Sequence, residues 1–449
     1  MHSGDADETT TSSRGGAVLL ITALVGIYVW ALIDRFLLAL LVDPIKATLH
    51  LTDVQVSLVV GAAFSVSYGL LSLPAGVLTD RVGRRAIVGG AATGWSAATA
   101  FCGFASSFAW LLVGRCGVGI AEAFITPASL SLIRDRVDAR VRGLAYSIFA
   151  MGPNVGGAIA LAGGGALLGV AQAGRLSAIP LIGSLAPWQV VLVLVGVSGL
   201  LPLIPLLFVR PDLRQLRPHL REETGWSPTR LGRHLAMHAV SYALLIGYVT
   251  ASAMLAFGVN GWMPAMMSRK FALSLPEVGL VSGPISLVAA VSGLLTCGAL
   301  IDRIAARGGD ILWLGVALEG LAAASAVGMT AAPDVHVAWA LFGATIFFAG
   351  SFYSVGVSEL TRITPSAYMG RVTALYLIFQ SSLGGALAPT VAALLASRFT
   401  GPTAVAHGLG LHCLIFGCLG AGLASLLAIH KRRDGSTRGA FLRQPRRAF

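Results

Sequence analysis

The feature that most constrains this chain is the repeated occurrence of apolar stretches long enough to cross a lipid bilayer. A transmembrane helix needs about 20 consecutive, mostly apolar residues. Only 12% of the 449 residues are charged, about half of the usual share in soluble domains. Backbone polar groups cannot be hydrated in hydrocarbon, so the chain is predicted to be an all-helical membrane protein. Twelve membrane-spanning helices are expected, at about residues 17–42, 54–79, 86–107, 109–133, 141–171, 187–208, 235–268, 277–301, 311–331, 336–361, 371–397 and 405–430.

The net charge of +12 would suit a nucleic-acid partner, but its distribution along the chain indicates membrane topology instead. Arginines gather in the loops on one side of the predicted spans, and the loops on the other side hold few basic residues. Cytoplasmic loops carry this excess, so both termini are expected in the cytoplasm. Abundant arginine, alanine and glycine with few lysines are typical of a GC-rich bacterial genome. We expect a multi-pass protein of the bacterial cytoplasmic membrane, in contact with membrane lipids and without a nucleic-acid partner.

A repeated loop motif divides the chain into two halves. GVLTDRVGRR (76–85) follows the second predicted span, and GALIDRIAAR (298–307) follows the eighth at an offset of 222 residues. Such a repeat indicates a duplicated six-helix unit. The expected organisation is a disordered cytoplasmic tail (1–16), an N-terminal bundle (17–208), a cytoplasmic linker (209–234), a C-terminal bundle (235–430) and a basic cytoplasmic tail (431–449).

The repeated motif resembles the gating loop of the major facilitator superfamily. The matching residues are Gly76, Asp80, Arg81, Gly83, Arg84 and Arg85, with Asp302 and Arg303 in the second copy. The resemblance implies two six-helix bundles around a central cavity and secondary transport by alternating access. We see no nucleotide-binding motif, hydrolase triad spacing or metal-spaced His/Cys cluster, so we expect no enzyme activity, no cofactor and no metal.

Four charged residues lie deep inside predicted spans of the N-terminal half, away from the span ends. Asp34 and Arg35 interrupt WALIDRFLLALL (30–41), and Arg115 and Glu122 lie seven residues apart on one face of the fourth span. A charged side chain in hydrocarbon costs about 2.5–3.5 kcal/mol on insertion scales, so these residues are expected to face the bundle interior. At about 1.5 Å per residue, Asp34 and Arg115 are nearly level, and Glu122 lies closer to the midplane.

This pattern is similar to that of the spinster-like transporters of the superfamily. The segments that carry the resemblance are Asp34-Arg35, RCGVGIAEA (115–123) and PASLSLIRD (127–135). Eukaryotic spinster proteins export amphipathic lipids, and bacterial relatives are thought to be proton-coupled. The resemblance implies proton coupling at Asp34 and Glu122, with Arg35 and Arg115 as charge partners or substrate-anion sites. The expected partners are protons and a small-molecule or lysolipid-like substrate, and the expected oligomeric state is a monomer.

Further polar and aromatic residues of the spans are candidates for the cavity wall. The segment Asn260 to Pro264 predicts a broken seventh helix at the outer gate, with Asn260 reaching the cavity. Glu319 is expected to be structural, and Glu359 to pair with Arg362 or a loop arginine. The cavity candidates are Tyr68, Asn154, Asn260, Trp262, Tyr353, Tyr376 and Gln380.

Three other functions remain open at this point. An organic-acid:proton symporter would also place Asp-Arg in helix one, although the Phe-Pro signature expected after helix four is replaced by TPASLSLIRDRVD (126–138). GPNVGG (152–157) matches part of the superfamily's antiporter motif, which favours a multidrug:proton antiporter. A non-transporting receptor would have no reason to retain Asp34 and Glu122 within the bilayer.

Overall fold

The computed structural model describes residues 14–81, 83–138, 141–209, 228–365 and 368–434. The predicted tails (1–16 and 431–449) and the linker (209–234) lie largely outside the described residues. The described residues form helices and the connections between them, as the spacing of the apolar stretches predicts.

The N-terminal half contains the helices up to α11. Their bounds are α1 Arg14–Leu40, α2 Val42–Leu49, α3 Asp53–Ser57, η1 Leu58–Ala62, α4 Ala63–Arg81, α5 Arg84–Gly103, α6 Phe108–Glu122, α7 Ile125–Arg136, α8 Arg142–Ala150, α9 Gly152–Gln172, α10 Pro187–Ser198 and α11 Leu203–Phe208.

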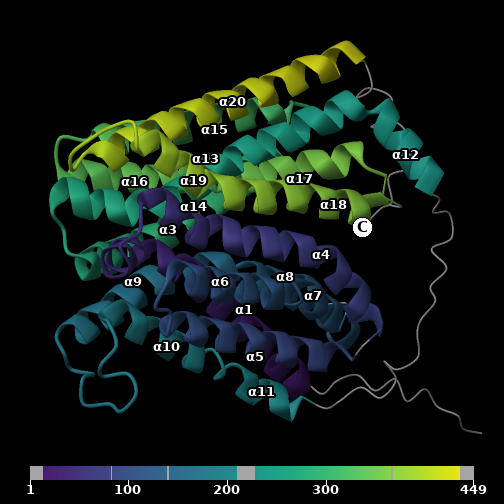
Figure 1. Cartoon of the computed structure of the whole chain (residues 1–449). Helices are drawn as coiled ribbons and strands as arrows, with labels where there is room; N and C mark the ends of the chain where they lie inside the picture. The colour runs from purple at the N-terminus through teal and green to yellow at the C-terminus, as the bar shows by residue number, and fades with distance from the viewer. Residues whose placement is uncertain (1–13, 82, 139–140, 210–227, 366–367, 435–449) are drawn as a thin grey trace, which may run out of the picture.

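The C-terminal half contains the remaining helices. Their bounds are α12 Pro228–Met237, α13 Ala239–Phe271, α14 Leu275–Ala306, α15 Ile311–Ala331, α16 Val335–Ala349, α17 Ser351–Ile363, α18 Met369–Leu377, η4 Ile378–Leu383, α19 Gly384–Ala396 and α20 Ala404–Asp434. Figure 1 shows these helices on one side of the molecule and those of the N-terminal half on the other.

Eleven helical segments of the described chain are long and apolar enough to cross a membrane. The exception among the twelve predicted spans is 86–107. It corresponds to α5, which begins with Arg84 and Arg85 and contains glycine, serine and threonine, so its apolar content is lower. With α5 counted, the helices follow the twelve expected spans.

Several spans are built from two helical pieces, and prolines explain two of the breaks. Pro127 has no N–H for the carbonyl of Ala123, and the fourth span breaks at 123–124 directly after Glu122. Pro153 acts in the same way on the fifth span, between α8 and α9. The predicted break at Pro264 is wrong, because α13 runs without interruption from Ala239 to Phe271.

Two spans contain a π-helical turn, in which one extra residue is inserted into the helix. η1 lies between α3 and α4 in the second span, and η4 lies between α18 and α19 in the eleventh. The two spans meet across the interface between the halves. A Cβ added to Gly61 of η1 would lie 2.8 Å from the carbonyl oxygen of Gly385 and 3.0 Å from Pro389 Cγ.

The two halves join most closely toward one end of the bundle. We call the end at which α1 begins and α20 ends the proximal end (right in Figure 1), and the opposite end the distal end. In the distal half of the bundle α9 packs against α14, where a Cβ on Gly279 would lie 2.3 Å from the carbonyl oxygen of Leu161. The small residues permit this contact between backbones. The structure is therefore closed at the distal end.

Candidate functional site

A buried salt bridge connects the first and fourth spans in the N-terminal half. Arg115 Nη1 donates to Asp34 Oδ2 at 2.8 Å, and both side chains are 1% exposed. Thr99 of α5 donates its hydroxyl to Asp34 Oδ1, also at 2.8 Å. Asp34 and Arg115, which the rise per residue places at similar depth in the membrane, thus pair directly. Arg115 Nε and Nη2 are buried without a hydrogen-bond partner among the described residues, so the guanidinium uses one of its three nitrogens.

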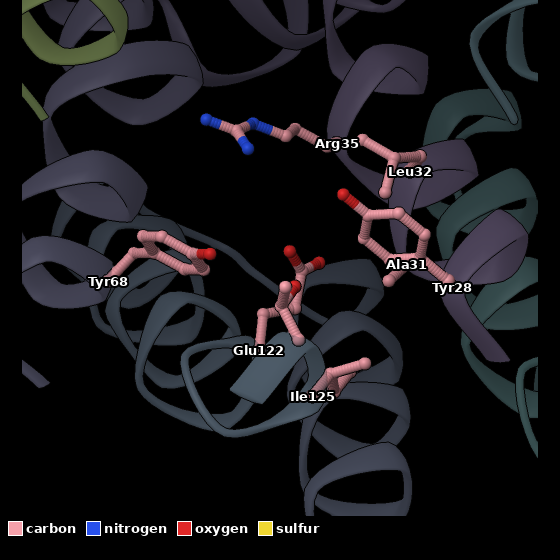
Figure 2. A pocket seen from close by; sticks show the side chains of 8 residues that line it. Tyr28, Ala31, Leu32, Arg35, Tyr68, Glu122 and Ile125 are labelled. Carbon is pink, nitrogen blue, oxygen red and sulfur yellow. The ribbon is translucent and has the colours of Figure 1, made fainter. Parts of the chain in front are cut away.

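Glu122 lies away from this salt bridge, in the wall of a small cavity. Arg35 lies in the same wall, together with Tyr28 and Tyr68. Figure 2 shows these four side chains directed toward a common space. Glu122 Oε1 is buried and has no hydrogen-bond partner in the described part of the chain. Arg115 and Glu122, which share one face of the fourth span, therefore have different surroundings: Arg115 pairs with Asp34, and Glu122 faces the cavity.

Arg35 contacts aromatic rings instead of a carboxylate. Its guanidinium carbon lies 4.4 Å from the ring centre of Phe64, 5.9 Å from that of Tyr68 and 5.6 Å from that of Phe257. Such cation–π contacts hold a guanidinium in place while leaving its N–H donors available. Phe257 belongs to α13, so Arg35 contacts both halves of the protein.

A second small cavity lies at the interface between the halves and shares Arg35 with the first. Its wall is largely apolar, with polar groups from Ser65 and Asn260. The other lining residues are Phe36, Ala39, Val60, Phe257, Gly261, Gly385 and Pro389. The site as a whole combines one guanidinium, one carboxylate and an apolar surface.

The structure brings some cavity candidates into these walls and places others elsewhere. Tyr68 and Asn260 line the first and the second cavity, respectively. Trp262 is fully buried between helices and donates its indole N–H to the carbonyl oxygen of Pro389 at 2.8 Å. Tyr376 is buried in the core of the C-terminal half. Gln380 is buried in η4, where its Oε1 has no partner among the described residues.

Two other candidates lie outside both walls or outside the described side chains. Asn154 lies in the first turn of α9 and is not a lining residue of either cavity. Tyr353 lies in α17, and its side chain is outside the described part of the structure.

The gating-loop residues lie at the proximal end. Arg84 forms an ion pair with Asp135 at the end of α7, and Arg85 donates to the carbonyl oxygen of Leu207 at 2.9 Å. Asp302 and Arg303 are exposed on α14. Gly83 immediately precedes α5. The side chains of the other motif residues are outside the described part; these are Gly76, Asp80 and Arg81.

Two buried carboxylates outside the cavities have partners within the C-terminal half. Glu319 accepts a hydrogen bond from the Ser252 hydroxyl at 2.7 Å, which fits the structural role expected for it. For Glu359 the expected arginine partner is secondary, because Lys431 Nζ lies at 2.5 Å and Arg362 Nη1 at 3.9 Å. The end of α20 brings Lys431 to this position, which the separation in sequence conceals.

Two groups of contacts in the structure involve residues that the sequence patterns did not single out. Phe257 is one of 19 phenylalanines, and no motif or charged residue directly beside it in the sequence marks it as a cavity residue. Arg269 forms hydrogen bonds with Asp43 and Asp53 at the distal end. The sequence does contain a signal for this network: charged residues are rare in the loops on that side, so the few that are present could have been expected to pair with one another. Within the described residues, no group of three or more His, Cys, Asp or Glu side chains could hold a metal ion.

Comparison with known proteins gives a consistent assignment. Residues 20–389 match the sequence model of the Major Facilitator Superfamily. An MFS-type efflux pump of Mycolicibacterium smegmatis is 26% identical over 426 residues, which cover 94% of each chain. A probable L-galactonate transporter of Escherichia coli is 24% identical over 286 residues, covering 62% of this chain and 59% of that protein.

Among solved structures, a bacterial homologue of the human lysosomal transporter Spinster, in an inward-facing and unoccupied conformation, superposes with a TM-score of 0.81. It is 24% identical, and the match covers 94% of this chain and 98% of that one. This likeness confirms, at the level of the fold, the expected spinster-like architecture. The chain is a multi-pass membrane transporter, not an enzyme, and it belongs to the Major Facilitator Superfamily.

Proposed function

We propose that the protein is a proton-coupled secondary transporter of an amphipathic or lipid-like organic anion. The observation that carries this proposal is the unpaired state of Arg35 and Glu122. They line one cavity, and neither forms a hydrogen bond or an ion pair with another described residue. A charge placed inside a membrane-spanning bundle is costly, so its retention without a fixed partner favours a partner that comes and goes.

Glu122 is the proposed principal proton site. The Asp34 and Arg115 charges cancel within their salt bridge, and Arg35 balances Glu122 in the cavity. Protonation of Glu122 would leave the Arg35 charge in excess, which favours the binding of an anion. A proton and a monovalent anion together restore the charge balance of the empty site, so their binding is coupled.

Asp34 is the proposed second proton site. Arg115 has two nitrogens without partners and shares a helix face with Glu122. A change of partner from Asp34 to Glu122 would alter the proton affinity of both carboxylates, because a nearby guanidinium favours a charged carboxylate. The exchange would connect protonation to movement of the first span against the fourth.

Arg35 is the proposed anion site, and the second cavity would hold the apolar part of the substrate. A guanidinium presents several donors in a planar arrangement that suits carboxylate and phosphate groups. Beside it, Phe36, Val60 and Phe257 offer an apolar surface that reaches the C-terminal half. A substrate that touches both halves at this point can influence their relative position.

The proposed topology places the proximal end and both termini in the cytoplasm, as the arginine-rich loops there suggest. In that orientation the distal closure corresponds to an inward-facing state. The motif arginines at the proximal end, Arg84 and Arg85, would then contribute to the cytoplasmic gate through Asp135 and α11.

A small organic acid is the second candidate substrate. The wall of the first cavity contains both a guanidinium and a carboxylate, which would suit a compact acid better than a long acyl chain. The similarity to a probable L-galactonate transporter supports this alternative. The efflux-pump relative keeps a multidrug:proton antiporter open as a third possibility for the same test.

Proton flux in proteoliposomes with an internal pH-sensitive dye tests the proposal. Lysophospholipids, sphingoid phosphates, sugar acids, aromatic acids and cationic dyes are added one at a time. Glu122→Gln is compared with Glu319→Gln, which makes the same chemical change to a buried carboxylate outside the cavities. We expect Glu122→Gln to abolish substrate-evoked flux and Glu319→Gln to retain at least half of it.

The substrate panel identifies the class of ligand. Flux evoked by lysophospholipids or sphingoid phosphates, and weakened more by Arg35→Gln than by Arg35→Lys, supports an amphipathic anion. Flux evoked only by sugar or aromatic acids supports the organic-acid symporter, and flux evoked only by cationic dyes supports the antiporter. Equal flux in Glu122→Gln and the natural protein would refute Glu122 as the coupling site.

A further inference from the structure

A charged cluster crosses between the two halves at the distal end. Arg269, near the end of α13, donates to Asp43 Oδ1 through Nε at 3.0 Å and through Nη2 at 2.5 Å. It also donates to both carboxylate oxygens of Asp53, through Nη1 at 3.0 Å and Nη2 at 2.9 Å. Asp43 lies in α2 and Asp53 opens α3, so one guanidinium binds two elements of the opposite half.

The cluster is balanced in formal charge, with two basic and two acidic side chains, and is only partly exposed. Lys46 Nζ forms a salt bridge with Asp53 Oδ1 at 2.8 Å, within the N-terminal half. The side chains of Arg269, Asp43 and Asp53 are 21%, 27% and 23% exposed. Multidentate guanidinium–carboxylate contacts of this kind are directional as well as strong. Arg269 is the member of the cluster that comes from the C-terminal half.

The cluster rests on the wall of the second cavity. The Arg269 guanidinium carbon lies 5.8 Å from the ring centre of Trp262, two helical turns earlier on α13. The Trp262 indole N–H donates to the carbonyl oxygen of Pro389 at 2.8 Å. Pro389 and Asn260 both line the cavity that contains Arg35. A continuous set of contacts therefore leads from the distal surface to the cavity.

We propose that Arg269 is a gate residue that holds the distal end closed, and that Trp262 is a positioning residue connecting this gate to the cavity wall. Release of Asp43 and Asp53 frees the distal end of α13 from the N-terminal half. Because Trp262 contacts both Arg269 and Pro389, the release changes the cavity wall at the same time. The inference concerns the gate alone and holds for any substrate or coupling ion.

The adjacent residue provides a matched control. Lys270 is also basic and lies on the same helical turn, but its ammonium group donates to the carbonyl oxygens of Thr330 and Ala332, both at 2.7 Å. These acceptors belong to the C-terminal half. Replacement of Lys270 removes a similar charge and similar hydrogen bonds without breaking a contact between the halves.

The test measures access to the cavity from each side of the membrane. The Asn260→Cys variant, which is the parent for all further variants, is labelled with a membrane-impermeant maleimide in intact cells and in inverted vesicles. Labelling of the natural protein, in which only the native cysteines react, is subtracted. We expect Arg269→Gln to raise the labelling rate from the distal side at least fivefold. Lys270→Gln is expected to stay within twofold of the Asn260→Cys parent.

Two further measurements separate a gate from general damage to the protein. Salt screens partly exposed charges, so distal labelling should rise with NaCl in the parent and be insensitive to NaCl in Arg269→Gln. The double variant Asp43→Asn with Asp53→Asn removes the same contact from the N-terminal half and should raise distal labelling as Arg269→Gln does. If Arg269→Gln does not fold, this double variant tests the same contact. Equal distal labelling in Arg269→Gln and Lys270→Gln would overturn the proposal.

Trp262→Phe tests the positioning role, because it retains the ring beneath Arg269 and removes the bond to Pro389. We expect a smaller rise in distal labelling that still depends on NaCl, since the charged cluster remains. Distal labelling unchanged from that of Asn260→Cys alone would show that the bond between Trp262 and Pro389 does not connect the gate to the cavity wall.

Discussion

Removal of Arg115 should destabilise the protein strongly, and removal of its partner as well should reverse most of the loss. Arg115→Met leaves the Asp34 carboxylate buried with a single hydrogen-bond donor, the Thr99 hydroxyl. Breaking one side of a buried ion pair costs about 3–5 kcal/mol. At about 1.4 kcal/mol per factor of ten, the unfolding equilibrium constant rises by roughly two to four orders of magnitude.

The double variant Asp34→Asn with Arg115→Met separates the ion pair from the packing. Asparagine can still accept from Thr99, and methionine fills much of the space left by Arg115. Replacement of a whole buried pair by neutral groups is often neutral or stabilising. We therefore expect the double variant to lie within about 1 kcal/mol of the natural protein, because Arg115 leaves two of its nitrogens without partners.

Equilibrium unfolding in mixed micelles with increasing dodecyl sulfate provides the measurement. The buried thiols of Cys102 and Cys413 react with a dye once the helices separate, and far-UV circular dichroism gives a second signal. Arg35→Met is the control, because it removes a guanidinium with aromatic contacts and no carboxylate partner. A smaller cost for Arg115→Met than for Arg35→Met would refute the reasoning. So would a double variant no more stable than Arg115→Met.

Three further predictions concern other parts of the fold. Gly279→Ala should raise maleimide access from the distal side, since its Cβ would meet backbone atoms of α9, whereas Gly298→Ala on the same helix meets nothing within 4 Å and should not. Burial, together with a neighbouring histidine, lowers the pKa of His234. The unfolded chain then binds more protons below about pH 6.5, so stability falls as the pH drops through that value, and His234→Gln should flatten this loss in thermal melts. Lys431→Met leaves a buried carboxylate without its closest cation and should lower the free energy of unfolding by about 3 kcal/mol while retaining transport activity in proteoliposomes.

The large-scale architecture could be predicted because it depends on patterns that the membrane imposes. Apolar length locates the spans, and the motif repeated at 222 residues divides the chain into two halves. The pairing of Asp34 with Arg115 also follows from simple geometry, because both residues must avoid lipid and they lie at similar depth. The position of Glu122 beside the cavity was expected from its depth near the midplane.

The details that failed depend on contacts between distant segments. A proline predicts a break only where neighbours do not stabilise the helix, and α13 remains continuous through Pro264 while the fourth span breaks near Pro127. Aromatic residues in a bundle can face a cavity or a core, and nothing in the sequence places Trp262 and Tyr376 in the core. The Arg269 cluster joins residues 226 and 216 positions apart, which no local pattern reveals.

The π-helical turns in the second and eleventh spans make these positions tolerant of a change in chain length. Each residue of a regular α-helix advances by about 100° around the axis, so a deletion within such a helix rotates everything that follows by that angle. A π-helical turn holds one residue more than an α-helical turn. Deletion of one residue from η4 would therefore restore an ordinary turn and leave α19 facing the same way, with Gly385 and Pro389 still against Gly61. Within these two spans, the loss of a single residue should be accepted more readily at the π-helical turn than in the regular helix beside it.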